Sequence, residues 1–129
     1  MTTPDQTASV RYIVDDVAAC VAFYTTLLGF TVGHDAAPAF AAVTRGPLRL
    51  LLSGPTSSGA RPLDDGSRPE PGGWNRIHLV VDDLDAEVAR LRAAGGTFRN
   101  AVVTGPGGAQ ILLVDPAGNL VELFEPATA

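Results

Sequence analysis

The chain of 129 residues is acidic, with 14 Asp and Glu against nine Lys and Arg and a net charge of −5. Its 46% hydrophobic and 18% charged residues are typical of one globular domain with a core of its own. The basic residues are scattered, whereas a nucleic-acid surface needs a concentrated positive patch, and no apolar run approaches the ~20 residues that span a bilayer. We therefore expect no nucleic-acid partner, no membrane partner and, since no secretion signal is visible, a cytoplasmic location.

The first predicted elements are a strand and a helix. Val10, Tyr12 and Val14 alternate with the residues between them, which is the period of a strand. Asp16 is then typical of a helix N-cap, and Gly29 of the left-handed residue that follows a helix. Between them runs an apolar stripe at helical spacing, formed by Val17, Cys20, Val21, Tyr24, Leu27 and Leu28.

Three short apolar runs follow, at residues 30–33, 40–43 and 48–52, each separated by turn residues. The next stretch, SGPTSSGARPLDDGSRPEPGG, is rich in Pro, Gly, Ser and Asp and is typical of a linker or a mobile flap. At ~20 residues it is long for a loop inside a compact domain, which favours a functional or flexible role.

The second half repeats the first. Residues 77–96 again give an apolar strand, an Asp-Asp pair and a helix ending near Gly96, and residues 97–103, 110–114 and 120–124 are again predicted strands. Position before a helix assigns these Asp pairs to helix capping rather than to acid–base chemistry. We predict an α+β fold in one domain, residues 1–129, with module one over 8–53, a linker over 54–73 and module two over 74–126. Two such curved sheets side by side would form a cup with room for a ligand.

The repeat, the segment FYTTLLGF (residues 23–30) and the ending DPAGNLVELFEP (residues 115–126) resemble the vicinal oxygen chelate superfamily. This is the group of glyoxalases, bleomycin-resistance proteins and dioxygenases. The resemblance covers nearly the whole chain. It implies paired βαβββ modules in a curved mixed sheet, and a homodimer.

The resemblance also implies a divalent metal on the floor of the cup in the enzymes of the superfamily. Carried over to this chain, the four ligand positions fall on Ser9, Leu50, Arg76 and Glu122. Only Glu122 is a good ligand, and a divalent cation needs three or four protein ligands in close geometry. A register shift would add His78 as a second ligand. We therefore expect no metal and no other cofactor, with a divalent metal as the alternative.

The residues predicted to point into the cup are Arg11, His78 and Glu122, with Gln110 on the neighbouring strand. An Arg suits an anionic group on a ligand, His78 suits proton transfer, and Glu122 suits a base or a hydrogen-bond acceptor. The alternative is a buried ion pair of Arg11 with Glu122 and a core histidine at His78. Trp74 is predicted either to stack on a planar ligand or to anchor the linker.

Three functions remain open at this point. The favoured prediction is a metal-independent protein that binds a small molecule in the cup, of the bleomycin-resistance or glyoxalase-like type. The alternative is a metal-dependent lyase, isomerase or dioxygenase that uses Glu122 and His78 as catalytic residues. A third possibility is a structural or regulatory module whose cup is filled by its own side chains. The sequence does not identify the ligand.

Overall fold

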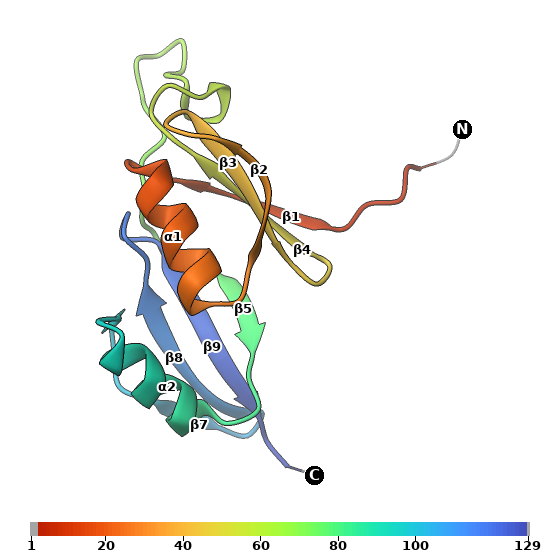
Figure 1. The fold of residues 1–129 in the computed structure, drawn as a ribbon, viewed down its shortest axis with the longest axis vertical. Helices are drawn as coiled ribbons and strands as arrows, with labels where there is room; N and C mark the ends of the chain where they lie inside the picture. The colour runs from red at the N-terminus through yellow and green to blue at the C-terminus, as the bar shows by residue number, and fades with distance from the viewer. Residues whose placement is uncertain (1–2, 129) are drawn as a thin grey trace. The chain divides into compact units, whose positions relative to one another are not determined.

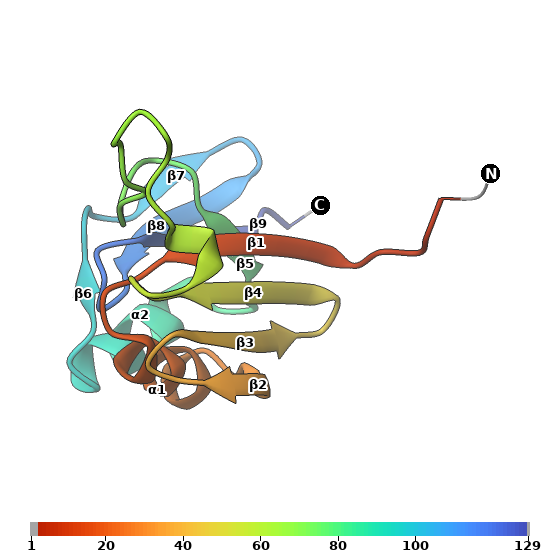
Figure 2. The same ribbon diagram turned by 90° about the horizontal axis from the view of Figure 1, so that it is seen from above.

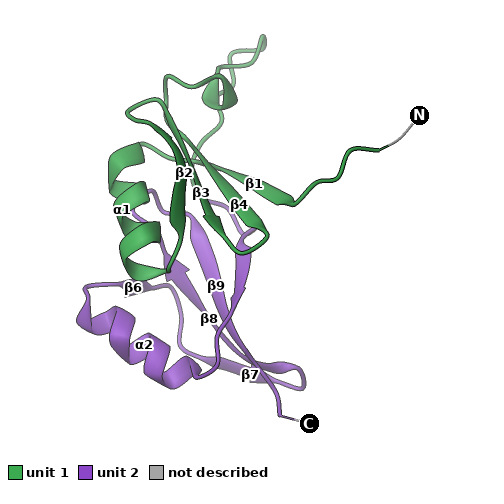
Figure 3. Cartoon of the chain, turned by 45° about the vertical axis from the view of Figure 1, so that its right-hand side comes forward, with its two compact units in different colours: residues 1–71 green, residues 72–129 purple. Residues whose placement is uncertain are grey.

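The computed structural model describes residues 3–128. The chain divides into two compact units, Met1–Pro71 and Gly72–Ala129, which Figure 3 colours separately. Each unit contains one mixed β-sheet and one α-helix, so the predicted α+β class with two βαβββ-type modules is confirmed. The segment predicted as a linker belongs almost entirely to the first unit.

The elements of the first unit are β1 (Ala8–Ile13), α1 (Val17–Leu27), β2 (Thr31–Ala36), β3 (Phe40–Arg45), β4 (Leu48–Ser53) and the 3₁₀ turn η1 (Ser58–Ala60). The four strands lie in the order β1-β4-β3-β2, which can be followed in Figure 2. β1 runs parallel to β4, and the other neighbouring pairs are antiparallel.

Helix α1 begins and ends where the sequence predicts. The carboxylate of Asp16 accepts a hydrogen bond from the backbone N–H of Ala19 at 3.0 Å, and Gly29 after the helix has φ +71°. Its apolar side is buried through Val17, Cys20 and Tyr24. The helix packs on β3 and β4, so one face of this sheet forms the core of the unit (Figure 1).

The elements of the second unit are β5 (Ile77–Val80), α2 (Leu84–Ala93), β6 (Thr97–Phe98), β7 (Val103–Gly105), β8 (Gly108–Val114) and β9 (Leu120–Pro126). Its strands lie in the order β5-β9-β8-β6, with β7 paired to β8. β5 is parallel to β9, and β8 and β9 form a long antiparallel hairpin. In the described part of the chain, neither helix is long and apolar enough to cross a membrane.

Helix α2 is capped like α1 but ends one residue earlier than predicted. Asp83 accepts a hydrogen bond from the N–H of Ala86 at 3.1 Å. The residue with positive φ after the helix is Gly95, at +89°, and not Gly96. Gly96 is required for a different reason, because a Cβ there would lie 2.8 Å from the carbonyl oxygen of Leu91.

The single strand predicted over residues 97–103 is two short strands, β6 and β7, with irregular backbone between them. A side chain causes the interruption. Asn100 Oδ1 accepts a hydrogen bond from the N–H of Leu112 at 2.9 Å, where a regular strand would present a backbone carbonyl. The N–H of Arg99 still donates to the Leu112 carbonyl oxygen at 2.9 Å, so the chain stays beside β8 through the break.

The first part of the predicted linker, residues 54–60, contacts the first sheet, whereas residues 61–68 are exposed. Turn η1 contacts β1 and β4. A Cβ on Gly59 would overlap the guanidinium of Arg11, and a Cβ on Gly54 would lie 2.6 Å from the Pro38 carbonyl oxygen. Glycine therefore permits a close approach of the backbone at both positions.

Further along the linker, a local turn forms around Asp65. Its carboxylate accepts hydrogen bonds from the hydroxyl of Ser67 at 2.6 Å and from the N–H of Ser67 at 2.9 Å. The hydroxyl and then the N–H of Ser67 lower the pKa of Asp65 below its usual value, since both bonds favour the ionised carboxylate.

The capping role of the Asp-Asp pairs can be tested on α2. Replacing Asp83 by Ala should lower the free energy of unfolding by about 1 kcal/mol, because the N–H of Ala86 loses its acceptor. Replacing the exposed Asp82 by Ala should change it by no more than about 0.5 kcal/mol. Urea denaturation followed by circular dichroism measures both. Equal losses in the two variants would contradict the capping assignment.

Candidate ligand-binding site

The two faces of the second sheet differ, because α2 packs on only one side of β9. On β9, Val121 and Leu123 are fully buried on the side of α2, since the next residue on that side, Glu125, accepts a hydrogen bond from Leu84 N at the start of the helix. Strand alternation places Glu122 on the opposite face. We call this opposite face of β5, β9 and β8 the site face.

Glu122 is the buried charge of the site face, with 7% of its surface exposed. Its Oε1 accepts hydrogen bonds from Arg76 Nε at 3.0 Å and from Arg76 Nη2 at 2.8 Å. The fork of the guanidinium thus neutralises the carboxylate, as a buried charge requires. Glu122 therefore forms its ion pair with Arg76, and the alternative pairing with Arg11 suggested by the sequence is not needed to satisfy it.

His78 completes the group. It lies directly beside Glu122 in the parallel ladder of β5 and β9, and its Nε2 is 3.3 Å from Glu122 Oε2. Its ring also packs on Phe124, with centroids 4.8 Å apart. The structure thus brings together two of the predicted site residues, His78 and Glu122, and leaves 47% of the His78 side chain exposed to solvent. An imidazole in contact with a carboxylate can exchange a proton with a bound molecule.

Trp74 is exposed and does not serve as a buried anchor. Its exposed fraction is 62%, its carbonyl oxygen accepts a hydrogen bond from Arg76 Nη1 at 3.2 Å, and the guanidinium of Arg99 lies 4.4 Å from its ring centroid. The segment before β5 is further held by Gly72 N, which donates to Asn119 Oδ1 at 2.7 Å. Trp74 therefore connects an Arg before β5 with an Arg after β6.

Gln110 belongs to the next set of cross-strand neighbours on the site face, two residues along β9 from Glu122. We call each such set a row. It stands opposite Phe124 in the β8–β9 hairpin and opposite Val103 on β7. Val80 extends the row on the other side of Phe124. Val80 and Val103 are 54% and 49% exposed, so this row offers apolar surface with one amide beside the polar group at Glu122.

Arg11 occupies the corresponding place in the first unit. Its Nη1 donates to Ser53 Oγ at 2.7 Å, and turn η1 approaches it through Gly59. Arg11 pairs with Leu51 across β1 and β4, just as His78 pairs with Glu122 across β5 and β9. Leu51, and not the predicted Leu50, is therefore the counterpart of Glu122, since Leu50 is fully buried.

These residues do not fit a divalent metal. With Leu51 in place of Leu50, the four ligand positions implied by the superfamily resemblance are Ser9, Leu51, Arg76 and Glu122. Of these, Glu122 is a suitable ligand. Within residues 3–128, no three His, Cys, Asp or Glu side chains are grouped as a metal site would need. The guanidinium of Arg76 already neutralises Glu122, which leaves His78 and one carboxylate oxygen against a requirement of three or four ligands.

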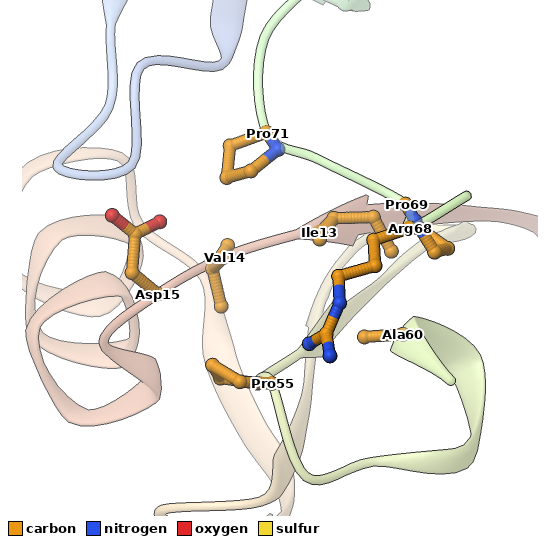
Figure 4. Close-up of a pocket in the computed structure, with 8 residues that line it drawn as sticks. All are labelled: Ile13, Val14, Asp15, Pro55, Ala60, Arg68, Pro69 and Pro71. Carbon is orange, nitrogen blue, oxygen red and sulfur yellow. The ribbon is translucent and has the colours of Figure 1, made fainter. Parts of the chain in front are cut away.

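A separate small cavity lies in the first unit, between the end of β1 and the linker (Figure 4). Its volume is about 150 Å³, and its walls include Ile13, Pro55, Ala60, Pro69 and Pro71. The Arg68 side chain reaches into it toward Pro55. Pockets for drug-sized ligands span roughly 300–1,000 Å³, so this cavity is too small for one.

Two contributors to the site face, Arg76 and Arg99, are not predicted from the sequence. The sequence places Arg76 only at an implied metal position, although its spacing of two residues from His78 puts both on one strand face. Arg99 lies where the strand predicted over 97–103 is interrupted. The sequence signal for Arg99 is that it follows the apolar Phe98, because neighbouring residues of a strand lie on opposite faces. In the structure the Phe98 ring lies under Arg92 of α2 and so points to the α2 side.

The comparisons with known proteins agree with this architecture. A family model for the glyoxalase-like domain matches residues 9–124. A member of the glyoxalase/bleomycin resistance protein/dioxygenase superfamily from Sphaerobacter thermophilus is 28% identical, with a TM-score of 0.74 over 95% of this chain and 98% of that one. None of the curated proteins matches the chain.

Two further solved structures share the fold at lower identity. Lactoylglutathione lyase from Agrobacterium tumefaciens is 24% identical, with a TM-score of 0.74 over 95% of both chains. The antibiotic binding protein TnmS3 from Streptomyces sp. CB03234 is 22% identical, with a TM-score of 0.72 over 98% of this chain and 100% of that one. One fold therefore serves an enzyme and a binding protein.

The ion pair at Glu122 makes a prediction about stability. Replacing Arg76 by Ala should lower the free energy of unfolding by about 1–3 kcal/mol, because Glu122 is left buried without its main partner. The matched control is Arg90, which pairs with Glu87 on the exposed side of α2. Its replacement by Ala should cost at most about 0.5 kcal/mol.

Denaturant unfolding at neutral pH measures both variants. The double variant Arg76→Met with Glu122→Leu should recover most of the loss, since no charge then remains buried. If the free energy of unfolding falls no more in Arg76→Ala than in Arg90→Ala, the buried pair contributes no more to stability than an exposed one.

Proposed function

This chain belongs to the glyoxalase-like domain family, and from that premise we propose that it is a metal-independent protein that binds a small molecule on the site face. The observation that supports this proposal is the pairing of Glu122 with Arg76. In the enzymes that this fold resembles, the corresponding carboxylate serves a metal ion. Here a guanidinium takes the place of the cation, at 2.8 Å from the same carboxylate.

The composition of the site face suits a ligand that is partly apolar. Phe124, Val80 and Val103 offer hydrophobic contact area, while Gln110 and His78 offer directed hydrogen bonds. A few polar groups within an apolar surface are typical of small-molecule sites, because the apolar part supplies affinity and the polar part fixes orientation. The described function of TnmS3 as an antibiotic binding protein is consistent with this use of the fold.

A second candidate is an enzyme in which His78 and Glu122 act on a substrate. The distance of 3.3 Å between His78 Nε2 and Glu122 Oε2 favours it, since a carboxylate that orients an imidazole is a common acid–base arrangement. Lactoylglutathione lyase shows that the fold accommodates catalysis. In the metal-dependent form of this candidate, Glu122 would have to leave Arg76.

Metal content separates the two candidates. Protein purified without chelator and analysed by mass spectrometry should contain far less than one divalent ion per chain, because Arg76 competes for the only good ligand. Replacing Glu122 by Gln should leave that value unchanged. About one ion per chain in the wild type, lost in Glu122→Gln, would support the metal-dependent enzyme and contradict the proposal.

Binding is tested with a chemically varied compound panel and thermal unfolding. A compound present at 100 times its Kd should stabilise the protein by about 2.7 kcal/mol, which raises the Tm by several degrees. Replacing Val80 by Glu should abolish the shift, because a charge then interrupts the apolar row of the site face. Val32, a similarly exposed strand valine of the first unit, is the control, and Val32→Glu should retain the shift. No response to any compound would leave the proposal without support.

We also propose that the protein is a cytoplasmic homodimer. The dimer follows from the resemblance and from the open strand edges, such as β2, whose residues are all exposed. Sedimentation velocity at micromolar concentration should give about twice the chain mass of 13.3 kDa. A stable monomer across that range would contradict this part of the proposal.

A further inference from the structure

We propose that the ligand of the site face is a planar aromatic compound carrying one negatively charged group, such as a carboxylate, which Arg99 binds. This inference rests on the proposed function and specifies the class of ligand. Its basis is the charge and the stacking of four side chains of the second unit: Trp74, Arg76, Arg99 and Glu122.

The balance of charge on the site face is positive, although the whole chain carries −5. Arg76 neutralises Glu122 through two hydrogen bonds. Arg99 is an additional cation whose guanidinium lies over the Trp74 ring. In the described part of the chain, Arg99 forms no ion pair with a carboxylate. A ligand that approaches this face therefore meets one uncompensated positive charge.

The placement of Arg99 follows from the sheet. Phe98 stands opposite Leu113, which is fully buried on the α2 side, so the residue after Phe98 turns toward the site face. Arg99 N bonds to Leu112 O, and Leu112 stands opposite Glu122. Neighbouring strands are about 4.8 Å apart, so Arg99 begins roughly 10 Å from Glu122. An anion at Arg99 is thus separated from the carboxylate of Glu122, which Arg76 already neutralises.

The stacking of Arg99 on Trp74 leaves its donors available. The guanidinium carbon of Arg99 lies over the Trp74 ring, 4.4 Å from its centroid. A guanidinium that contacts a ring through its face keeps its N–H groups in its own plane, where they can bind another group. That fork matches the two oxygens of a carboxylate. The contact with Trp74 also restricts the side chain before binding, so less conformational freedom is lost when an anion binds.

The aromatic part of the ligand has contacts on the same face. Trp74 is 62% exposed. Phe124 and Val80 form the row next to that of Leu112 and Glu122 on the same face. Flat rings gain most from such surfaces, because they bury apolar area and stack on other rings. A cationic ligand is disfavoured here, since it would approach Arg99 and find the carboxylate of Glu122 already paired.

Three probes that share one ring system test the charge preference: 2-naphthoate, 2-naphthamide and 2-naphthylmethylammonium. Isothermal titration calorimetry should show 2-naphthoate binding at least 10-fold more tightly than the other two, and its affinity should fall as salt is added. The chain contains one tryptophan, so the single indole N–H signal in an amide NMR spectrum reports binding at Trp74. That signal should shift with 2-naphthoate.

Variants assign the preference to one residue. Arg99→Gln should reduce the affinity for 2-naphthoate about 10-fold or more and leave that for 2-naphthamide unchanged. Arg99→Lys should retain part of the affinity, because it keeps the charge but loses the fork. The control Arg90→Gln, on the exposed side of α2, should bind all three probes as the wild type does.

Three results overturn the inference. The first is tighter binding of the amide or the ammonium probe, and the second is equal 2-naphthoate affinity in Arg99→Gln and the wild type. The third is a Trp74 signal that 2-naphthoate leaves unmoved. If another compound of the panel then binds the site face, the proposed function stands and only the class of ligand is wrong. If no probe and no panel compound binds, the proposed function fails as well.

Discussion

The ion pair of Arg76 with Glu122 determines what the second sheet offers to other molecules. A carboxylate that is 7% exposed requires a charged or hydrogen-bonding partner, since burial without one is strongly unfavourable. The guanidinium supplies two bonds from a single direction, and His78 approaches the other carboxylate oxygen. The charge of the site face depends on this neutralisation, because it removes the negative charge that would attract a cation.

Much of the fold could be predicted from the sequence because its signals are local. The N-caps Asp16 and Asp83 and the alternating strands depend on neighbouring residues, so the helices begin where expected. The helix end at Gly95 and the interruption at Asn100 were not predicted, since both depend on contacts with β8 or within the last helical turn. The counterpart of Glu122 in the first unit is expected at Leu50 when the turns before β4 and β9 are aligned in sequence. The pairing of β1 with β4 places it at Leu51 instead, because strand register is set by pairing across the sheet.

The site was only partly predictable for a related reason. His78 and Glu122 were expected to share a face, and the parallel ladder places them side by side. A pair of Arg11 with Glu122 is only one of the alternatives that the sequence allows, because sequence alone gives no cross-strand distances. The contact of Trp74 with Arg99 joins residues at opposite sides of the sheet, and no periodic pattern links them. The identity of a buried group can thus be read from a sequence more readily than the identity of its partner.

The close approach of Gly59 to Arg11 has a consequence for how this chain can vary. Turn η1 contacts β1 and β4, and there is no room for a Cβ at Gly54 or Gly59. Residues 61–68, in contrast, are all exposed. Natural variation in length between the two halves should therefore accumulate in the second stretch and spare the first. A fluorescent or affinity tag inserted within the exposed residues 61–68 should be tolerated better than the same insertion at position 58, which should displace the turn that contacts Arg11.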